Sequence, residues 1–162
     1  MTFDGTNTFL DINYPPISPS AYSLEWIINT DTNVNYNQAI GMGDSTLVDW
    51  GSFMVHSSST GGLFCGTDTA TRFIPSDLPS VYVNGVNVHC AFTFGNGTAS
   101  FYKNGSLVKT KTMNISTLAA FDRLRISTSV DGYLPAVKVY DRALSAEEVQ
   151  QNFNTIKGRF GI

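Results

Sequence analysis

Charged residues are scarce in this sequence. Only 14% of its 162 residues are Asp, Glu, Lys or Arg, whereas an ordinary soluble domain carries about 25%. The ten Lys and Arg residues are scattered singly and the net charge is -3, so no basic stripe is available to neutralise nucleic-acid phosphates. We therefore expect no nucleic-acid partner. We also expect a surface rich in Ser, Thr, Asn and Gly, which suits a β-rich extracellular or virion protein.

Long apolar runs are absent as well. No segment approaches the roughly 18 apolar residues of a membrane span, and the opening MTFDGTNTFL lacks the features of a signal peptide. These absences predict no membrane contact and no secretion by this chain alone. Two origins stay open, namely a protein released from the cytoplasm by lysis and a domain cut from a longer chain. The length predicts a single domain over residues 1–162.

Cysteine and histidine occur only twice each. Cys65 and Cys90 are 25 residues apart and match no metal-ligand spacing, so we expect two buried free thiols, with a disulfide as the open alternative. His56 and His89 have no Ser or Cys beside them in a recognisable nucleophile setting. Each histidine is therefore predicted to be a surface or half-buried strand residue and not a catalytic base.

Glutamate is also rare, with three in the chain. A glycoside hydrolase needs two carboxylates that face each other across the sugar. Glu25 lies in a predicted strand, and Glu147 with Glu148 stands at a predicted helix start, where acidic residues favour the helix dipole. No such facing pair is visible, so the sequence predicts that the protein is not an enzyme.

What the sequence does contain is alternation of polar and apolar residues. Before residue 140 this alternation is broken at short intervals by Gly, Asn, Asp or Pro, which predicts many short strands and an all-β protein. In residues 21–30 the side chains of Tyr22, Leu24, Trp26 and Ile28 share one face, and those of Ser23, Glu25 and Asn29 share the other. Residues 86–94 repeat the pattern. Each strand is predicted to bury one face, and the pattern does not say whether the second face meets water or a partner.

Turn residues locate one hairpin. Residues 98–102 and 107–111 flank Asn104-Gly105, whose residue types suit the two positive-φ positions of a type I′ turn. Asn96-Gly97 and Asn114 are also interpreted as turn residues. Further strands are predicted over 124–127 and 134–140, and the polar stretches 29–40 and 51–62 are predicted to be loops or strand edges.

One helix is predicted near the end of the chain. Ser145 followed by Glu148 forms a capping box before an apolar series that starts at Val149. The helix is expected to be short and to stop at Gly158. Residues 159–162 are expected to return along the sheets as a strand extension.

Several segments resemble laminin G-like jelly rolls of the concanavalin A-like lectin and glucanase superfamily. They are Phe3-Asp4-Gly5-Thr6-Asn7, the pair 89–94 and 100–105, and the series Asp131-Gly132-Tyr133, 137–145 and Glu147-Glu148. The resemblance implies a two-sheet antiparallel jelly-roll sandwich with one short C-terminal helix. The tail 152–161 is similar to endings of laminin G-like domains in tailed phages and environmental viruses, which implies a virion protein. The fold alone does not fix the function.

Lectin-type sites combine loop oxygens with an aromatic ring, and the segment 44–50 contains such residues. Asp44 and Asp49 are candidate oxygen ligands for calcium, the one cofactor considered, and Trp50 is a candidate stacking ring. A turn with a rim tryptophan explains the same residues. Asp131 with Tyr133 is a second candidate ligand site, and an Asp-Gly turn before a buried strand explains it as well.

Two functions follow from these observations. The first is a non-enzymatic virion surface protein, a phage capsid decoration or a tail or fibre component, located on the extracellular virion. It would dock on other virion structural proteins, bind host glycans, and form a homo-oligomer such as a trimer with Ile27, Phe53 or Phe64 at its contacts. The alternative is a calcium-dependent carbohydrate-binding module of a larger secreted protein.

Overall fold

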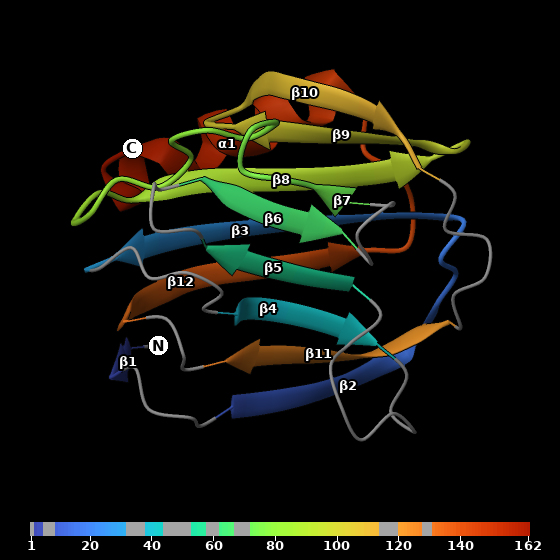
Figure 1. The fold of residues 1–162 in the computed structure, drawn as a ribbon, viewed down its shortest axis with the longest axis horizontal. Coiled ribbons are helices and arrows are strands. Elements are labelled where there is room, and N and C mark those ends of the chain that lie inside the picture. Colours follow the sequence, from blue (N-terminus) through green and yellow to red (C-terminus); the bar gives the residue numbers. More distant parts are fainter. Residues whose placement is uncertain are drawn as a thin grey trace.

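Two antiparallel sheets face each other, and one helix lies against the outside of one of them (Figure 1). The computed structural model describes residues 2–4, 9–31, 38–43, 53–57, 62–66, 72–113, 120–127 and 131–162. The predicted all-β jelly-roll sandwich with a C-terminal helix is confirmed. No helix among these residues is long and apolar enough to cross a membrane.

Each sheet has six strands, and the chain passes repeatedly from one sheet to the other. Sheet A has the order β1 (Thr2–Asp4), β12 (Asp131–Tyr140), β3 (Ala21–Thr30), β8 (Val88–Gly95), β9 (Thr98–Lys103) and β10 (Ser106–Thr112). Sheet B has the order β2 (Phe9–Ile17), β11 (Phe121–Ser127), β4 (Gln38–Gly43), β5 (Phe53–Ser57), β6 (Leu63–Gly66) and β7 (Arg72–Phe73). The helix α1 spans Ala146–Phe160.

Aromatic rings fill the space between the sheets. The ring of Tyr22 on β3 lies 4.9 Å from that of Phe121 on β11, and Trp26 on β3 lies 6.0 Å from Phe101 on β9. All four side chains are buried, and edge-to-face pairs of this kind add about 0.5–1.5 kcal/mol each beyond the buried area. The predicted apolar face of β3 is therefore confirmed as the core face.

The two cysteines belong to this core. Cys65 on β6 and Cys90 on β8 are both buried and both free. Burial raises the pKa of each thiol well above its usual range, so both thiols stay protonated and behave as small core side chains. The expected buried free thiols are confirmed.

Tight turns connect the strands of sheet A. Asn104 and Gly105 have φ values of 50° and 76°, and Asn96 and Gly97 have values of 51° and 72°. Both pairs thus provide the two positive φ angles of a type I′ turn. The predicted hairpin is confirmed, with strands one residue longer at each turn end than expected. Asn114 lies outside the described residues.

The second face of β3 is also buried, which corrects the prediction of one buried face. Glu25 is 2% exposed, and Ile27 is fully buried, so Ile27 is not available for contacts between proteins. His89 on β8 is fully buried as well and is no surface residue. The cover is α1 and the segment before it, a contact between distant parts of the chain that strand periodicity does not encode. The side chains of Phe53 and Phe64 lie outside the description.

The helix is longer than predicted. Its N-terminal capping box at Ser145 and Glu148 is confirmed. At the other end Gly158 stays inside the helix, and Gly161 ends it in the left-handed conformation with its N–H bonded to the Lys157 carbonyl. A glycine inside an exposed helix costs only about 1 kcal/mol, whereas the left-handed cap favours glycine. The predicted strand extension over residues 159–162 is therefore wrong.

Candidate functional site

The residues predicted to form a site fall into two groups in the structure. Asp44, Asp49 and Trp50 lie outside the described residues. Asp131 begins β12, where its backbone pairs with that of Asp4, and its side chain is outside the description. Tyr133 lies on the helix side of sheet A. The ligand roles of these residues remain predictions.

Calcium also remains a prediction. Within the described ranges, no group of three or more His, Cys, Asp or Glu side chains is placed to hold a metal ion. The proposed ligands Asp44 and Asp49 were not part of that search, because their segment is not described.

Polar side chains fasten the C-terminal segment to the outer face of sheet A. The hydroxyl of Ser23 donates to the Arg142 carbonyl and accepts from the Leu144 N–H, both at 2.9 Å. At the far end of the helix, the Asn87 amide donates to the Phe160 carbonyl at 2.6 Å. Asn29 connects Asn87 to Tyr133 by donating to the side chains of both. Tyr133 therefore belongs to the network that holds the helix.

A buried carboxylate lies at the centre of this interface. Glu25 accepts hydrogen bonds from the Tyr140 hydroxyl at 2.8 Å and from the Asn152 amide at 3.1 and 3.2 Å. Nε2 of His89 lies 3.7 Å from Glu25 Oε1, within ion-pair range but too long for a hydrogen bond. The His89 ring packs against Phe153 of the helix with a centroid distance of 5.7 Å. Glu25 and His89 are buried, and the contacts of this cluster attach the helix to sheet A.

The contacts of Glu25 also decide its protonation. Burial acts to raise the pKa of this carboxyl, but His89, Tyr140 and Asn152 together outweigh burial and lower it. Glu25 is thus held as an anion beneath the helix. The same environment raises the pKa of Tyr140, through burial first and the Glu25 charge second, so Tyr140 stays a hydrogen-bond donor.

The outer face of sheet B carries a second polar group, and α1 does not cover it. Arg125 on β11 donates from Nε and Nη2 to the two carboxylate oxygens of Asp11 on β2, each at 2.8 Å. Arg123, two residues before Arg125 on the same face, brings Nη1 to 3.9 Å from the same carboxylate. Asn13 is paired with Arg123 in the ladder and is exposed. We call Asp11, Asn13, Arg123 and Arg125 the arginine patch.

Glycines adjoin the arginine patch. On β4, Gly43 is the ladder partner of Arg123 and Gly41 is the partner of Arg125. Neither position has a side chain that would compete with the guanidinium groups for space. The Arg125 guanidinium is held by its two-point contact with Asp11, which places a planar donor group beside a carboxylate acceptor, on the same sheet face as the Asn13 amide. Such a set of planar polar groups is suited to recognising hydroxyl and carboxylate groups.

Sequence reasoning missed the arginine patch. Its members come from two strands that are 114 residues apart, and their only local signal is the alternation Arg123-Leu-Arg-Ile126 and Asp11-Ile-Asn13. That alternation predicts an outward polar face on each strand separately. It does not reveal that the two faces are neighbours.

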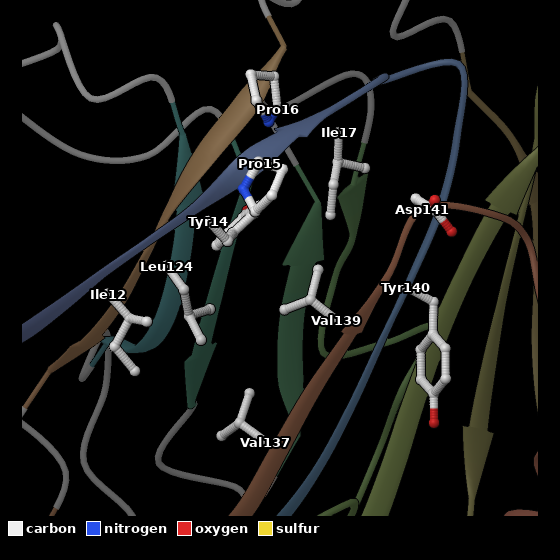
Figure 2. Close-up of a pocket in the computed structure, with 10 residues that line it drawn as sticks. All are labelled: Ile12, Tyr14, Pro15, Pro16, Ile17, Leu124, Val137, Val139, Tyr140 and Asp141. Carbon is white, nitrogen blue, oxygen red and sulfur yellow. The ribbon is translucent and has the colours of Figure 1, made fainter.

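A groove opens between the sheets at the edge formed by β2 and β12. Its volume is 530 Å³, and it is lined by Ile12, Tyr14, Pro15, Pro16, Ile17, Leu124, Val137, Val139, Tyr140 and Asp141 (Figure 2). Figure 2 shows Val137 and Val139 on one side, and Ile12, Tyr14 and Leu124 on the other. The lining is mostly apolar, so this groove lacks the polar set that a sugar needs.

The sequence matches a family model described as concanavalin A-like lectin/glucanases superfamily, of the laminin G type, over residues 4–150. The chain belongs to this superfamily. The match covers most of the sequence, including the strands of both sheets and the start of the helix. Comparison with curated proteins gives no match.

Solved structures share the fold of this superfamily member. A native heptameric SAP-like pentraxin from Limulus polyphemus aligns with a TM-score of 0.68 at 18% identity, covering 92% of this chain and 78% of the pentraxin. Trypanosoma rangeli sialidase aligns with a TM-score of 0.60 at 14% identity, covering 82% of this chain and 22% of the sialidase. Botulinum neurotoxin type C aligns with a TM-score of 0.68 at 11% identity, covering 91% of this chain and 40% of the toxin structure. These likenesses show a lectin-like fold.

All three glutamates have structural roles in this fold. Glu25 is enclosed beneath the helix, and Glu148 completes the capping box and pairs with Arg142. Glu147 accepts a hydrogen bond from the Ser145 hydroxyl in the first turn. These contacts account for the side chains of all three glutamates within the described part of the chain.

Proposed function

We propose that this protein is a non-catalytic carbohydrate-binding domain and that its glycan site is the arginine patch on the outer face of sheet B. The observation that carries the proposal is the fixed pair of charged groups there: Asp11 and Arg125 joined by two hydrogen bonds of 2.8 Å. Asp11 and Asn13 are exposed beside them. A lectin-like fold with a preorganised polar group on the sheet face that α1 does not cover is consistent with binding of sugar hydroxyls.

The outer face of sheet A supports this placement of the glycan site, because its polar side chains are covered. On sheet A, the polar side chains Ser23, Glu25 and Asn29 are buried and bonded to the C-terminal segment or its neighbours. A glycan reaches them only if the helix leaves. The helix does not cover the arginine patch, because α1 lies against sheet A on the opposite side of the sandwich.

Two structural neighbours are consistent with a glycan ligand. One is Trypanosoma rangeli sialidase in complex with sialic acid, and another is botulinum neurotoxin type C, described as depending on interaction with two ganglioside molecules to enter cells. Their identities of 14% and 11% carry the fold alone to this chain. The proposal that this protein binds a glycan therefore depends on the arginine patch.

We further propose a virion surface as the setting of this domain, with other structural proteins as partners and a homo-oligomer, such as a trimer, as its assembled form. The support is the similarity of the tail 152–161 to viral laminin G-like endings and the low charge of the surface. A calcium ion held by Asp44 and Asp49 belongs to the alternative, a module of a larger secreted protein. In that alternative Trp50 stacks on the sugar.

The direct test is binding to a glycan array by wild-type protein and by Arg123→Gln and Arg125→Gln variants, in calcium and in chelator. Arg159→Gln is the matched control, because Arg159 is exposed on the helix and remote in the fold from sheet B. We expect glycan binding that both patch variants weaken at least about tenfold and the control leaves intact. Binding that survives both patch substitutions would refute this site, and binding that disappears in chelator would favour the calcium module.

A further inference from the structure

The dipeptide Asn-Gly occurs three times in this chain, at residues 84–85, 96–97 and 104–105. In such a pair the backbone nitrogen of the glycine can attack the side-chain amide carbon of the asparagine, because glycine has no side chain to hinder the approach. Ammonia leaves, and water then opens the resulting succinimide ring to give aspartate or isoaspartate. The reaction needs no reagent except water, so the local structure decides which pair reacts.

Two groups must be free for the attack, namely the N–H of the glycine and the side-chain amide of the asparagine. A hydrogen bond that holds either group has to open before the ring can close. The free energy of that local opening is added to the barrier of the reaction. The contacts around the three pairs therefore predict their relative rates.

The first pair is blocked at the attacking nitrogen. The N–H of Gly85 donates to the Thr30 carbonyl at the end of β3, at 2.8 Å. Space is not the limit here, because a Cβ added at Gly85 would meet no described atom within 4 Å. The exposed Asn84 is therefore protected by the hydrogen bond to Thr30.

The third pair is held at the amide and covered by the helix. Oδ1 of Asn104 accepts from the His89 N–H at 3.0 Å, and the Asn104 N–H donates to the His89 carbonyl at 2.8 Å. Gly105 is buried, and a Cβ added there would lie 2.8 Å from atoms of Gln150 and Phe153 on α1. The Asn104 amide thus reaches the Gly105 nitrogen only if the contacts with β8 and the helix loosen.

The middle pair lacks both kinds of protection. Asn96 and Gly97 have almost the same φ angles as the pair 104–105, but they lie at the opposite end of β9 (Figure 1). Asn96 is exposed, and among the described residues no hydrogen bond engages its side chain or the Gly97 N–H. A Cβ added at Gly97 would come no closer than 4.0 Å to a described atom. Both reacting groups are therefore free.

We propose that Asn96 is a site of spontaneous deamidation in the folded protein and that the other two Asn-Gly pairs are protected by their contacts. The product adds a negative charge to the end of the β8–β9 hairpin, and isoaspartate also inserts a backbone carbon into a two-residue turn. The Gly97 carbonyl accepts from the N–H of the buried Met113 at 2.9 Å, so the altered turn adjoins the core. The inference is independent of the glycan proposal, because this hairpin belongs to sheet A.

The test follows the conversion of each pair by mass spectrometry. The folded protein is stored at mildly alkaline pH, samples are digested with pepsin at acid pH, and fragment ions locate each conversion and separate isoaspartate from aspartate. We expect Asn96 to convert at least about tenfold faster than Asn84 and Asn104. In urea that unfolds the chain, the three rates should become similar, because the protecting contacts are lost.

Variants test the site and the cause of protection. Asn96→Gln should abolish the acidic form that appears on storage in ion-exchange chromatography, and Asn84→Gln, at another exposed turn position, is the matched control that should retain it. Phe153→Ala removes a ring that covers Gly105, so it should speed the conversion of Asn104. Asn84 serves as the internal control for general unfolding in that variant.

Several results would overturn the proposal. They are equal rates at the three pairs in the folded protein, faster conversion at Asn84 or Asn104 than at Asn96, and an acidic form that persists in Asn96→Gln. An unchanged rate at Asn104 in Phe153→Ala would overturn the protective role given to the helix.

Discussion

The outer faces of the two sheets contain similar polar side chains with opposite surroundings. On sheet A, Glu25 is 2% exposed and bonded to residues of β12 and the helix. On sheet B, the side chain of Asp11 is 30% exposed and bonded to Arg125. Both are carboxylates on strands, and both have a lowered pKa. The difference is the helix α1, which packs against the polar face of sheet A and does not cover the polar face of sheet B.

The largest expected effect is the loss of the carboxylate on the covered face. Glu25→Ala removes the buried carboxylate to which the Tyr140 hydroxyl and the Asn152 amide donate and which lies 3.7 Å from His89 Nε2. Removing one partner of a buried polar cluster lowers the free energy of unfolding by about 3–5 kcal/mol. Urea denaturation followed by circular dichroism measures this loss. A change below about 1 kcal/mol would contradict the role given to Glu25.

A smaller effect is expected where sheet A meets the helix at a turn. In Gly105→Ala the new Cβ would lie 2.8 Å from atoms of Gln150 and Phe153 on the helix. Gly97→Ala is the matched control, because Gly97 has nearly the same φ in an equivalent turn and its new Cβ would lie 4.0 Å from the Met113 carbonyl oxygen. Both lose about 1 kcal/mol for the left-handed backbone. Gly105→Ala should lose at least about 1 kcal/mol more, and equal thermal stability of the two variants would argue against close helix packing.

The carboxylates on the two sheet faces should also affect the acid dependence of stability. The folded-state pKa of Glu25 is lowered, so its contribution to stability is present above the unfolded pKa of about 4.3 and is lost as the pH falls through the folded value. Glu25→Gln should therefore flatten the decline of unfolding free energy below about pH 5. Urea melts from pH 7 to pH 2.5 test this, with Asp11→Asn as the exposed counterpart. An unchanged acid slope in Glu25→Gln would mean that another carboxyl group controls it.

The smallest effect on stability is expected on the open face. Asp11→Ala removes a partly exposed ion pair, which contributes at most about 1 kcal/mol. The same change frees the Arg125 guanidinium from its two-point contact, so glycan affinity should fall while the fold persists. Thermal melts and glycan-array binding, measured on the same sample, check the stability and the glycan affinity of the variant. A large loss of stability would mean that Asp11 holds the fold together, as Glu25 does, and is not part of the glycan site.

The pattern of residues within single segments was enough to predict much of the fold. The strand over residues 21–30, the Asn104-Gly105 turn and the Ser145 cap depend on residues close in sequence, and each was predicted. β2 was not identified, because Pro15 and Pro16 interrupt its pattern. The burial of Glu25 and His89 was also not predictable, because a polar strand face looks the same whether water or a helix lies against it.

The candidate site was less accessible to sequence reasoning than the fold. Glycan-type residues were sought in one continuous loop, around Trp50, and that loop lies outside the described residues. The arginine patch instead arises from two strands brought together by the sandwich, with Asp11 and Arg125 at the two ends of a 114-residue separation. Only the register of β2 against β11 makes them neighbours.

The position of α1 at the end of the chain has a consequence for synthesis on the ribosome. Residues 146–160 leave the exit tunnel after all the strands of sheet A, because they follow those strands in the sequence. Until then, the face of β3 and β8 that the helix will cover is bare. That face carries the polar Ser23, Glu25, Asn29 and His89 beside the apolar Ile27 and Ala91. A partly polar joint exposes less apolar surface in the unfinished protein than an apolar joint would, and exposed apolar surface is what makes such intermediates prone to aggregate.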